Sequence, residues 1–412
     1  MDRGGQGVRI TLSPCKKGYR EETHRAVSPE ETLARVTEKI PLAGITRVAD
    51  ITNLDRIGIP VFSSIRPTAQ EGAVSVYNGK GATPTEARVS AVMEGIERYS
   101  AEIHDHAITS GTWPEMAAKG EAVDPRSLNI PRGSDPDGRL PWVEAWDIVA
   151  DAGVFVPAHA VFHPLPRGCP PLFRTNTNGL ASGNTREEAV FHGLAEIVER
   201  DAWSLVEVTK RPGPRITDPP EGLPAELLRK FADAKVEVQV RDITSDLGIP
   251  TCAAVADDTL LRDPRLLTIG MGTHTSARIA FLRALTEVAQ SRLTQIHGAR
   301  EDTTTADLRT RMGYDRVRRM NRYWFEADSE VPFSALPTAE HDDFLKDIGA
   351  IVSALGKAGM DRVLVADLTR EEIGVPVVRV VVPGLEVFAM DNERIGARCR
   401  DAERGRLSRT KP

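Results

Sequence analysis

The sequence is poor in cysteine and has no long hydrophobic run. Its 412 residues include only four cysteines, and no two of them form a CxxC pair. A disulfide framework and a zinc site with cysteine ligands are therefore not indicated, and we expect all four thiols to be reduced. The longest apolar run, Val375–Leu385, is interrupted by Arg379 and by two prolines. About 18 uninterrupted apolar residues are needed to cross a bilayer, so we expect no transmembrane helix.

Aromatic residues are scarce and the charges are nearly balanced. Only 5% of the residues are aromatic, and 53 basic against 59 acidic residues give a net charge of −6. Because the chain also lacks a basic arm, we expect no nucleic-acid partner. The first residues, Met1–Gln6, contain no apolar segment behind a basic start, so nothing marks a signal peptide and we expect a cytoplasmic protein.

Two common nucleotide-binding motifs are also missing. The sequence contains neither the P-loop pattern GxxxxGKS/T nor the dinucleotide pattern GxGxxG. The short run Gly79-Lys80-Gly81 is by itself only a weak signal. Any nucleotide site in this chain must therefore be built in another way.

Internal repetition is the most informative feature that is present. Three segments share the pattern V-x-D-I/L-T followed by G-I/V-P, namely Val48–Val61, Val240–Thr251 and Val365–Val377. An apolar run, a polar turn and a second run that opens with proline predict two antiparallel strands, because proline is tolerated at the first residue of a strand. A looser fourth copy spans Trp142–Phe162.

A second repeat is helical. Gly81–Arg98 aligns without gaps on Gly183–Arg200 with seven of eighteen residues identical, and Ser276–Arg292 is a degenerate third copy. The first two copies begin with T-x-x-E, the capping-box pattern of a helix start. A glycine-containing loop precedes each copy. The chain thus repeats a unit of hairpin, strand, glycine loop and helix three times, and a fourth hairpin closes it.

These units predict a single α/β domain in which helices face a mixed or antiparallel sheet, because one unit alone cannot bury its sheet. Ser28 and Pro29 mark the start of one more helix ahead of the units. We expect an N-terminal tail at 1–14, a catalytic domain at 15–390 and a C-terminal tail at 391–412. The parts expected within the domain are a helix at 28–39, units at about 45–101, 142–207 and 237–296, and a closing hairpin at 362–385.

The repeated helices carry acids on one face. At 100° per residue, Glu188, Glu196 and Glu199 lie within an 80° arc of one helix, and Glu86, Glu94 and Glu97 occupy the same arc of the other. A single helix of this kind is usually a solvated acidic face. Here the pattern occurs twice, and the opposite faces are apolar, as expected for helices that pack on a sheet.

If the repeated helices approach one another, four to six carboxylates converge, and their repulsion requires cations. Oxygen ligands without cysteine and without a paired-histidine motif favour magnesium or another hard cation. Magnesium beside arginines and glycine loops at helix starts indicates a nucleoside triphosphate.

The segments NGKGATPTEARVSAVMEGIERYSAE, TNGLASGNTREEAVFHGLAEIVERD and RALTEVAQSR resemble the signature segments of the YcaO family, and the likeness extends from about residue 18 to 386. The resemblance implies an ATP-binding α/β fold unrelated to P-loop proteins, with ATP used to activate a peptide backbone amide. It also implies a homodimer.

Carried over motif by motif, the resemblance implies two sets of site residues. The implied magnesium ligands are Glu94, Glu97, Glu188, Glu196 and Glu199. The implied nucleotide contacts are Arg25, Thr32, Ser90, Asn184, Arg200 and Arg283. Glu86 is not carried over and keeps its interpretation as a capping residue, and no catalytic base is identified.

The last segments of the sequence indicate which branch of the family the chain resembles. Azoline-forming members typically end in a PxPxP tail, whereas this sequence ends in SRTKP. With the closing segment DLTREEIGVPVVRVVVPGLE, this resembles the archaeal methanogenesis-marker members that work with TfuA. The resemblance implies thioamidation, with sulfide or another sulfur donor, of a protein or peptide substrate such as a glycine of methyl-coenzyme M reductase. Two alternatives are an azoline-forming cyclodehydratase and a non-catalytic adaptor that binds ATP or a peptide.

Overall fold

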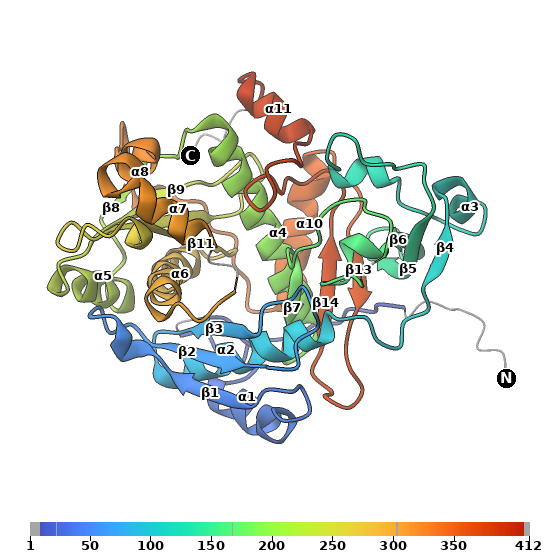
Figure 1. Cartoon of the computed structure of the whole chain (residues 1–412), viewed down its shortest axis with the longest axis horizontal. Coiled ribbons are helices and arrows are strands. Elements are labelled where there is room, and N and C mark those ends of the chain that lie inside the picture. Colours follow the sequence, from blue (N-terminus) through green and yellow to red (C-terminus); the bar gives the residue numbers. More distant parts are fainter. Residues whose placement is uncertain (1–8, 22, 167, 302–303, 408–412) are drawn as a thin grey trace.

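The computed structural model describes residues 9–407 except 22, 167, 302 and 303, and arranges the described strands in three sheets (Figure 1). The first sheet contains β1 (Arg47–Asp50), β2 (Val61–Ile65) and β3 (Val76–Lys80). The second has the order β11 (Thr268–Thr273), β10 (Thr251–Asp257), β9 (Glu237–Asp242), β8 (Arg215–Thr217) and β12 (Glu330–Pro332). The third has the order β4 (Thr109–Gly111), β5 (Leu140–Asp147), β13 (Leu364–Asp367), β14 (Val377–Val381) and β7 (Leu180–Ser182), with β6 (Ala152–Pro157) on β5.

Helices cover these sheets and three of them meet at the centre of the molecule. The three central helices are α2 (Pro84–Ser100), α4 (Arg186–Thr209) and α6 (Ala277–His297). The others are α1 (Pro29–Val36), α3 (Trp113–Ala117), α5 (Leu223–Asp233), α7 (Thr304–Met312), α8 (Tyr314–Met320), α9 (Arg322–Phe325), α10 (Phe344–Lys357) and α11 (Ala397–Glu403). Among the described strand pairs, β8 and β12 are parallel and the others are antiparallel, so the predicted fold of mixed and antiparallel sheets faced by helices is confirmed. Among the described helices, none combines the length and apolar character needed to cross a membrane.

The hairpin repeat is explained by the same set of hydrogen bonds in all three copies. The aspartate that ends the first strand accepts a bond of 2.9 Å from the N–H two residues later. The threonine hydroxyl at that position accepts a bond of 3.1 to 3.2 Å from the first N–H of the second strand. The glycine that opens the G-I/V-P motif has φ between 66° and 69°, a conformation that favours glycine. These residues are Asp50, Asp242 and Asp367, Thr52, Thr244 and Thr369, and Gly58, Gly248 and Gly374.

The third unit is assembled from two distant parts of the chain. The strand that leads into α4 is β7, and β7 pairs with β14 of the closing hairpin, where Ser182 lies opposite Val377. The β5–β6 hairpin, which precedes β7 in the expected unit at 142–207, lies instead beyond β13. The closing hairpin carries the complete aspartate and threonine pattern, which the Trp142–Phe162 copy lacks. The equivalent units are therefore β1-β2-β3-α2, β9-β10-β11-α6 and β13-β14-β7-α4.

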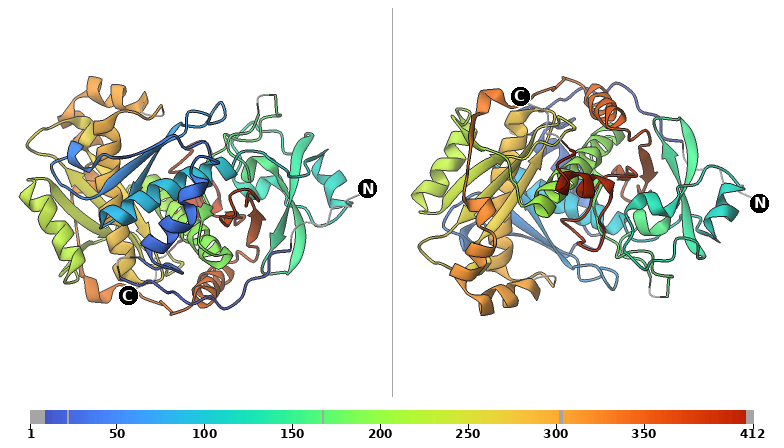
Figure 2. Two further views of the ribbon diagram at one scale, coloured as in Figure 1. Left: turned by 90° about the horizontal axis from the view of Figure 1, so that it is seen from below. Right: turned by 90° about the horizontal axis from the view of Figure 1, so that it is seen from above.

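The three units form a ring. Helix α2 contacts β7 of the next unit, α4 contacts β11, and α6 contacts β3, which brings the three helices together (Figure 2). Strand glycines let a helix backbone lie directly on its own sheet. A Cβ atom on Gly79 would lie 1.9 Å from the backbone nitrogen of Ala91, and one on Gly270 would lie 2.1 Å from that of Val288. The faces of α2, α4 and α6 that point away from their sheets are thereby directed at one another.

The described part of the segment expected as a C-terminal tail is folded. Helix α11 packs on α4, where Arg398 forms ion pairs with Asp201 at 2.8 Å and with Asp246 at 2.7 Å. Cys399 is fully buried beside them. Residues 408–412 lie outside the described residues, and the division into tails and one domain stays a prediction.

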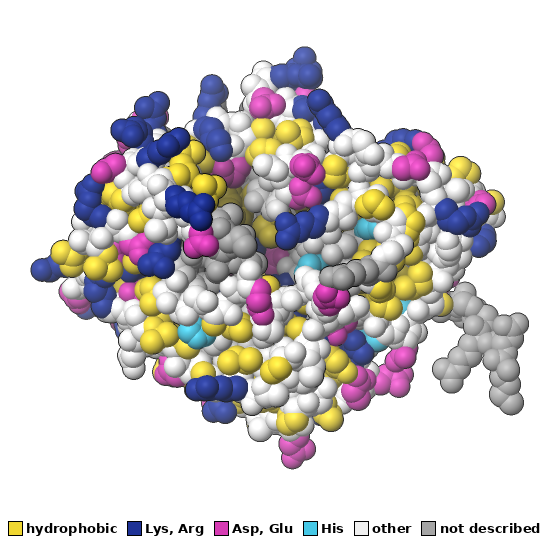
Figure 3. All heavy atoms as spheres, viewed as in Figure 1, with side chains coloured by type: hydrophobic (Ala, Val, Ile, Leu, Met, Phe, Trp, Pro, Cys, Tyr) yellow, Lys and Arg dark blue, Asp and Glu magenta, His cyan; other side chains and the backbone are white. Residues whose placement is uncertain are grey.

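The polar region at 301–341 contributes α7, α8, α9 and β12 to one edge of the molecule. In the view of Figure 3, Lys and Arg side chains gather near α8. Arg316 and Arg319 of α8 are exposed there.

Candidate functional site

A cavity of about 360 Å³ lies where α2, α4 and α6 converge, next to the segment that leads into α1. All eleven residues singled out in the sequence line this cavity, although they come from positions up to 258 residues apart, Arg25 to Arg283. They are Arg25, Thr32, Ser90, Glu94, Glu97, Asn184, Glu188, Glu196, Glu199, Arg200 and Arg283.

Equivalent positions of the three helices face the cavity together. One such position holds Ser90, His192 and Arg283, and the next holds Glu94, Glu196 and Glu287. The third holds Glu97, Glu199 and Gln290. The sequence repeat therefore corresponds to a threefold arrangement of side chains around one space.

The acids of α2 are held by a neighbouring arginine and by the backbone of another unit. The Glu94 carboxylate pairs with Arg98 one turn later, with the guanidinium nitrogen 2.5 Å from the carboxylate oxygen. Glu97 accepts a hydrogen bond of 2.8 Å from the backbone N–H of Ser182 in β7. The orientation of Glu97 thus depends on the contact between the first and third units.

On α4, Glu188 is tied to the segment ahead of α1. It accepts hydrogen bonds from the backbone N–H of Ala26 at 2.9 Å and from the side-chain amide of Asn184 at 3.2 Å, and Arg25 lies 3.5 Å away. Arg25 also contacts the imidazole of His192.

The two later acids of α4 line the same cavity. Glu196 accepts a hydrogen bond of 3.2 Å from the backbone N–H of Gly179, and Glu199 lies 3.5 Å from Arg200. Glu199 is 2% exposed, so its negative charge is almost entirely removed from water.

Burial and mutual repulsion raise the pKa values of three of these acids. Burial raises the pKa of Glu97 well above its ordinary value, and the nearby Glu94 adds repulsion. Burial likewise raises the pKa of Glu196, and it raises that of Glu199 to about 7 against the opposing attraction of Arg200. The arginines therefore do not fully compensate the acids, and the cavity favours additional positive charge.

The residues implied as nucleotide contacts lie around the same space. The Thr32 hydroxyl donates to Asn184 at 2.9 Å, which joins α1 to the start of α4. The Ser90 hydroxyl accepts from the backbone N–H of Lys80 at 3.3 Å. The buried Nε atoms of Arg200 and Arg283 have no hydrogen-bond partner among the described residues. Buried guanidinium donors without partners are suited to phosphate oxygens, which accept such bonds in pairs.

These residues fit a hard cation together with a nucleotide. In the part of the chain that the structure describes, no three Asp, Glu, His or Cys side chains form a ready group of metal ligands, because the acids are paired with cations and backbone N–H groups. The donor set nevertheless consists of carboxylate oxygens, which magnesium prefers. The raised pKa values of the acids and the Nε atoms of Arg200 and Arg283, which have no hydrogen-bond partner among the described residues, fit a site that binds a cation together with an anionic group.

Several cavity residues were not singled out in the sequence. Lys80 forms an ion pair with Glu287, and despite burial the pKa of Glu287 is lowered by Lys80 and Arg200. A signal existed for both residues, since Lys80 lies between two glycines and Glu287 aligns with Glu94 in the degenerate third copy. Arg98 was also signalled, because it ends the repeated pattern E-x-x-E-R.

Comparisons with known proteins agree with this site. The sequence model of one protein family, described as YcaO cyclodehydratase, ATP- and Mg²⁺-binding, matches residues 78–386. A protein of Methanothermobacter thermautotrophicus is 52% identical over 385 residues, covering 92% of this chain and 99% of the relative. A protein of Rhizobium leguminosarum bv. trifolii, named for its position in the region 3' of tfuA, is 35% identical over 405 residues, covering 91% of this chain and 92% of the relative.

A solved structure has the same architecture. The structure of YcaO from Methanopyrus kandleri, bound with AMPPCP and Mg²⁺, matches with a TM-score of 0.78 at 32% sequence identity. The match covers 93% of this chain and 98% of that one. The architecture expected from the repeats is therefore shared over almost the whole length of both chains.

Proposed function

Because the chain belongs to the YcaO family, whose members bind ATP and Mg²⁺ and modify peptide backbones, we propose that it converts a backbone amide of a protein substrate into a thioamide. The observation that carries the proposal is the cavity in which buried acids with raised pKa values lie beside Arg200 and Arg283, whose buried Nε atoms have no hydrogen-bond partner among the described residues. Such a cavity suits a magnesium-bound triphosphate better than it suits a neutral ligand.

The proposed reaction consumes ATP and hydrogen sulfide and releases ADP and phosphate. Sulfide adds to the carbonyl carbon, and the amide oxygen takes the γ-phosphoryl group from ATP. The carbon–oxygen bond then breaks with loss of phosphate, and C=S replaces C=O. Phosphorylation is needed because oxide or hydroxide would be a poor leaving group.

We propose separate roles for the acidic residues of the cavity and for the residues that surround them. We assign Glu94, Glu97, Glu188, Glu196 and Glu199 to holding magnesium, which neutralises charge on the transferring phosphoryl group. We assign Arg25, Thr32, Ser90, Asn184, Arg200 and Arg283 to holding the nucleotide. Arg200 and Arg283 can each offer two parallel N–H groups to phosphate oxygens, which fixes the direction of transfer.

The likeness to the protein from the tfuA region supports a TfuA-like partner and the thioamide branch. We further propose that the substrate is a protein, with a glycine of methyl-coenzyme M reductase as the first candidate, and that the enzyme is a homodimer.

The family description favours a second candidate function, azoline formation, since it names a cyclodehydratase. There a Cys, Ser or Thr side chain of the substrate would replace sulfide as nucleophile, and one water would be lost.

Mass spectrometry of the substrate after incubation with ATP, magnesium and sulfide tests the proposal. Thioamidation adds the mass difference between sulfur and oxygen and releases one ADP per product. Loss of the mass of one water, independent of added sulfide, would instead establish the azoline reaction. An unchanged substrate with no ADP release would refute both.

A further inference from the structure

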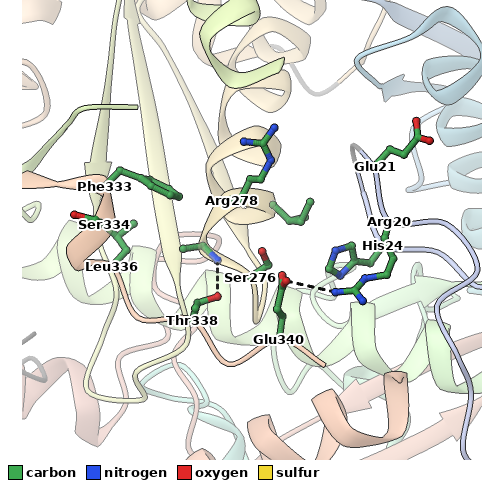
Figure 4. Close-up of a pocket in the computed structure, with 12 residues that line it drawn as sticks. Arg20, Glu21, His24, Ser276, Arg278, Phe333, Ser334, Leu336, Thr338 and Glu340 are labelled. Carbon is green, nitrogen blue, oxygen red and sulfur yellow. Dashed lines mark hydrogen bonds and ion pairs between the residues drawn. The ribbon is translucent and has the colours of Figure 1, made fainter. Parts of the chain in front are cut away.

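A second cavity, of about 580 Å³, is lined by a different set of residues from the first one (Figure 4). Its walls come from Arg20, Glu21 and His24, from the first turn of α6 and from the segment at 333–340. None of the eleven residues implied in magnesium or nucleotide binding lines it. Its volume is within the range of about 300 to 1,000 Å³ that is usual for ligand sites.

One side of this cavity is apolar. Figure 4 shows Phe333 and Leu336 on this side, and Ile279 of α6 also lines the cavity. Phe333 packs on Phe281 with ring centroids 5.9 Å apart, which fixes its position. These side chains provide a contact surface for an aliphatic side chain of a ligand.

The other side is polar and carries two arginines, Arg20 and Arg278, and two glutamates, Glu21 and Glu340. Arg20 is matched by Glu340, with nitrogen and oxygen 3.4 Å apart. Arg278 bonds only to the backbone carbonyl of Glu221 at 3.0 Å and has no carboxylate partner among the described residues. Among the described residues, Arg278 is therefore the cation of this cavity that remains available to a ligand carboxylate.

The start of α6 adds one hydroxyl at the same place, while the backbone N–H of Ala277 donates to the Thr338 hydroxyl at 3.4 Å. Ser276 precedes this helix of 21 residues and is 5% exposed, yet its hydroxyl does not cap the helix and has no hydrogen-bond partner among the described residues. Figure 4 shows this hydroxyl between Arg278 and Glu340. By contrast, the equivalent Thr83 and Thr185 accept bonds from their own helices. A buried hydroxyl without a partner at a positive helix end suits a carboxylate.

A short hairpin separates the two cavities. Gly18 donates to the carbonyl of Ala26 at 3.1 Å, and Tyr19 and Arg25 exchange backbone hydrogen bonds. Thr23 and Arg25 of this hairpin line the first cavity, which contains the glutamates of α2 and α4. Arg20, Glu21 and His24 line the second cavity. A ligand in the second cavity would therefore lie against the residues next to Arg25.

We propose that the second cavity binds a segment of the protein substrate that carries an acidic side chain beside an aliphatic one. The carboxylate pairs with Arg278 and accepts from Ser276, and the aliphatic side chain packs on Phe333 and Leu336. This inference rests on the proposed function, because an enzyme that modifies one backbone amide must hold the chain beyond that amide. It adds the chemistry by which the substrate is recognised.

Fluorescence anisotropy of the full chain without ATP tests this site. The probe is a fluorescein-labelled peptide amide with the sequence Gly-Leu-Asp-Gly-Leu-Gly, compared with the same peptide carrying Asn in place of Asp. We expect the Asp peptide to bind about tenfold more tightly. Arg278→Gln and Ser276→Ala should each remove this preference, while Arg229→Gln on the exposed face of α5 should keep it.

Near-UV circular dichroism shows that the variants remain folded, and Ser276→Ala removes no capping bond. Equal affinity for the two peptides, or an unchanged preference in both variants, would overturn the inference. Thioamide formation with an unchanged KM for the protein substrate in Arg278→Gln would also overturn it while leaving the proposed function intact. If the two variants lose the preference for the Asp peptide but the wild-type chain never forms a thioamide, the site is supported and the proposed function is refuted.

Discussion

The Glu97 carboxylate on α2 accepts its hydrogen bond from the backbone N–H of Ser182, a residue of another unit. The equivalent residue on α6, Gln290, donates instead to the backbone carbonyl of Asn78 in β3 at 3.1 Å. An acid fits where the neighbouring strand presents an N–H, and an amide fits where it presents a carbonyl. The departure of the third helix from the acidic pattern therefore follows from the backbone group that it meets.

Neutralising the central acids should abolish ATP consumption. We expect Glu97→Gln and Glu196→Gln to lower substrate-dependent ATP turnover by about a hundredfold or more, because an amide binds magnesium much more weakly than a carboxylate does. Both amides retain an oxygen that can accept the bond from Ser182 or Gly179, so the fold should persist. Turnover is measured by ADP release over a magnesium titration, with Glu226→Gln on exposed α5 as control. Wild-type turnover and ATP affinity in both variants would contradict the metal assignment.

Arg283 should bind the phosphates of ATP through its planar guanidinium group as well as through its charge. Arg283→Lys keeps the charge but loses the second parallel N–H, so ATP affinity should fall by about tenfold. Calorimetric titration with a non-hydrolysable ATP analogue measures this, and Arg229→Lys provides a control away from the cavity. An unchanged titration would assign Arg283 a structural role only.

Arg398 should matter for stability and not for chemistry. Its partner Asp201 is completely buried, so Arg398→Ala leaves an unpaired carboxylate and should lower the free energy of unfolding by about 3 kcal/mol. Urea unfolding measures this loss, with the exposed Arg404→Ala as control. A variant as stable as the wild type would show that α11 adds little to the packing of α4.

Two histidines with lowered pKa values predict a loss of stability in acid. Burial lowers the pKa of His24 and of His163 to about 4, and the nearby Lys17 and Arg98, respectively, add repulsion. Each imidazole has a pKa of about 6.5 in the unfolded chain, so the unfolded state takes up more protons as the pH falls from about 6.5 to 4. Stability should therefore be full above this window and decrease through it.

Urea midpoints measured between pH 7 and pH 4.5 test this dependence. His163→Gln, which cannot titrate, should flatten the decrease. An equally steep decrease in His163→Gln would assign the acid sensitivity to other groups.

Much of the candidate site could be predicted from the sequence because its acidic residues recur at equivalent positions of the repeated helices. The patterns T-x-x-E and E-x-x-E-R fix which face of each helix carries the acids, and the structure shows that the contacts between units bring those faces together. The pairing of β7 with β14 could not be predicted in this way, since Ser182 and Val377 are far apart in the chain and share no local signal. The cations that pair with the acids were also missed. Lys80 and Glu287 belong to different units, so their ion pair forms only when the two units lie side by side.

The origin of the third unit from two parts of the chain has a consequence for biosynthesis. Helix α4 and β7 leave the ribosome well before β14, and about 195 residues must be added in between, which takes roughly 10 to 40 s at usual rates of translation. During that interval one strand partner of β7 does not exist, and Glu97 has no ordered Ser182 to face. We therefore expect a chain that ends before β14 to lack the assembled cavity, because β7 then has no strand that holds Ser182 opposite Glu97.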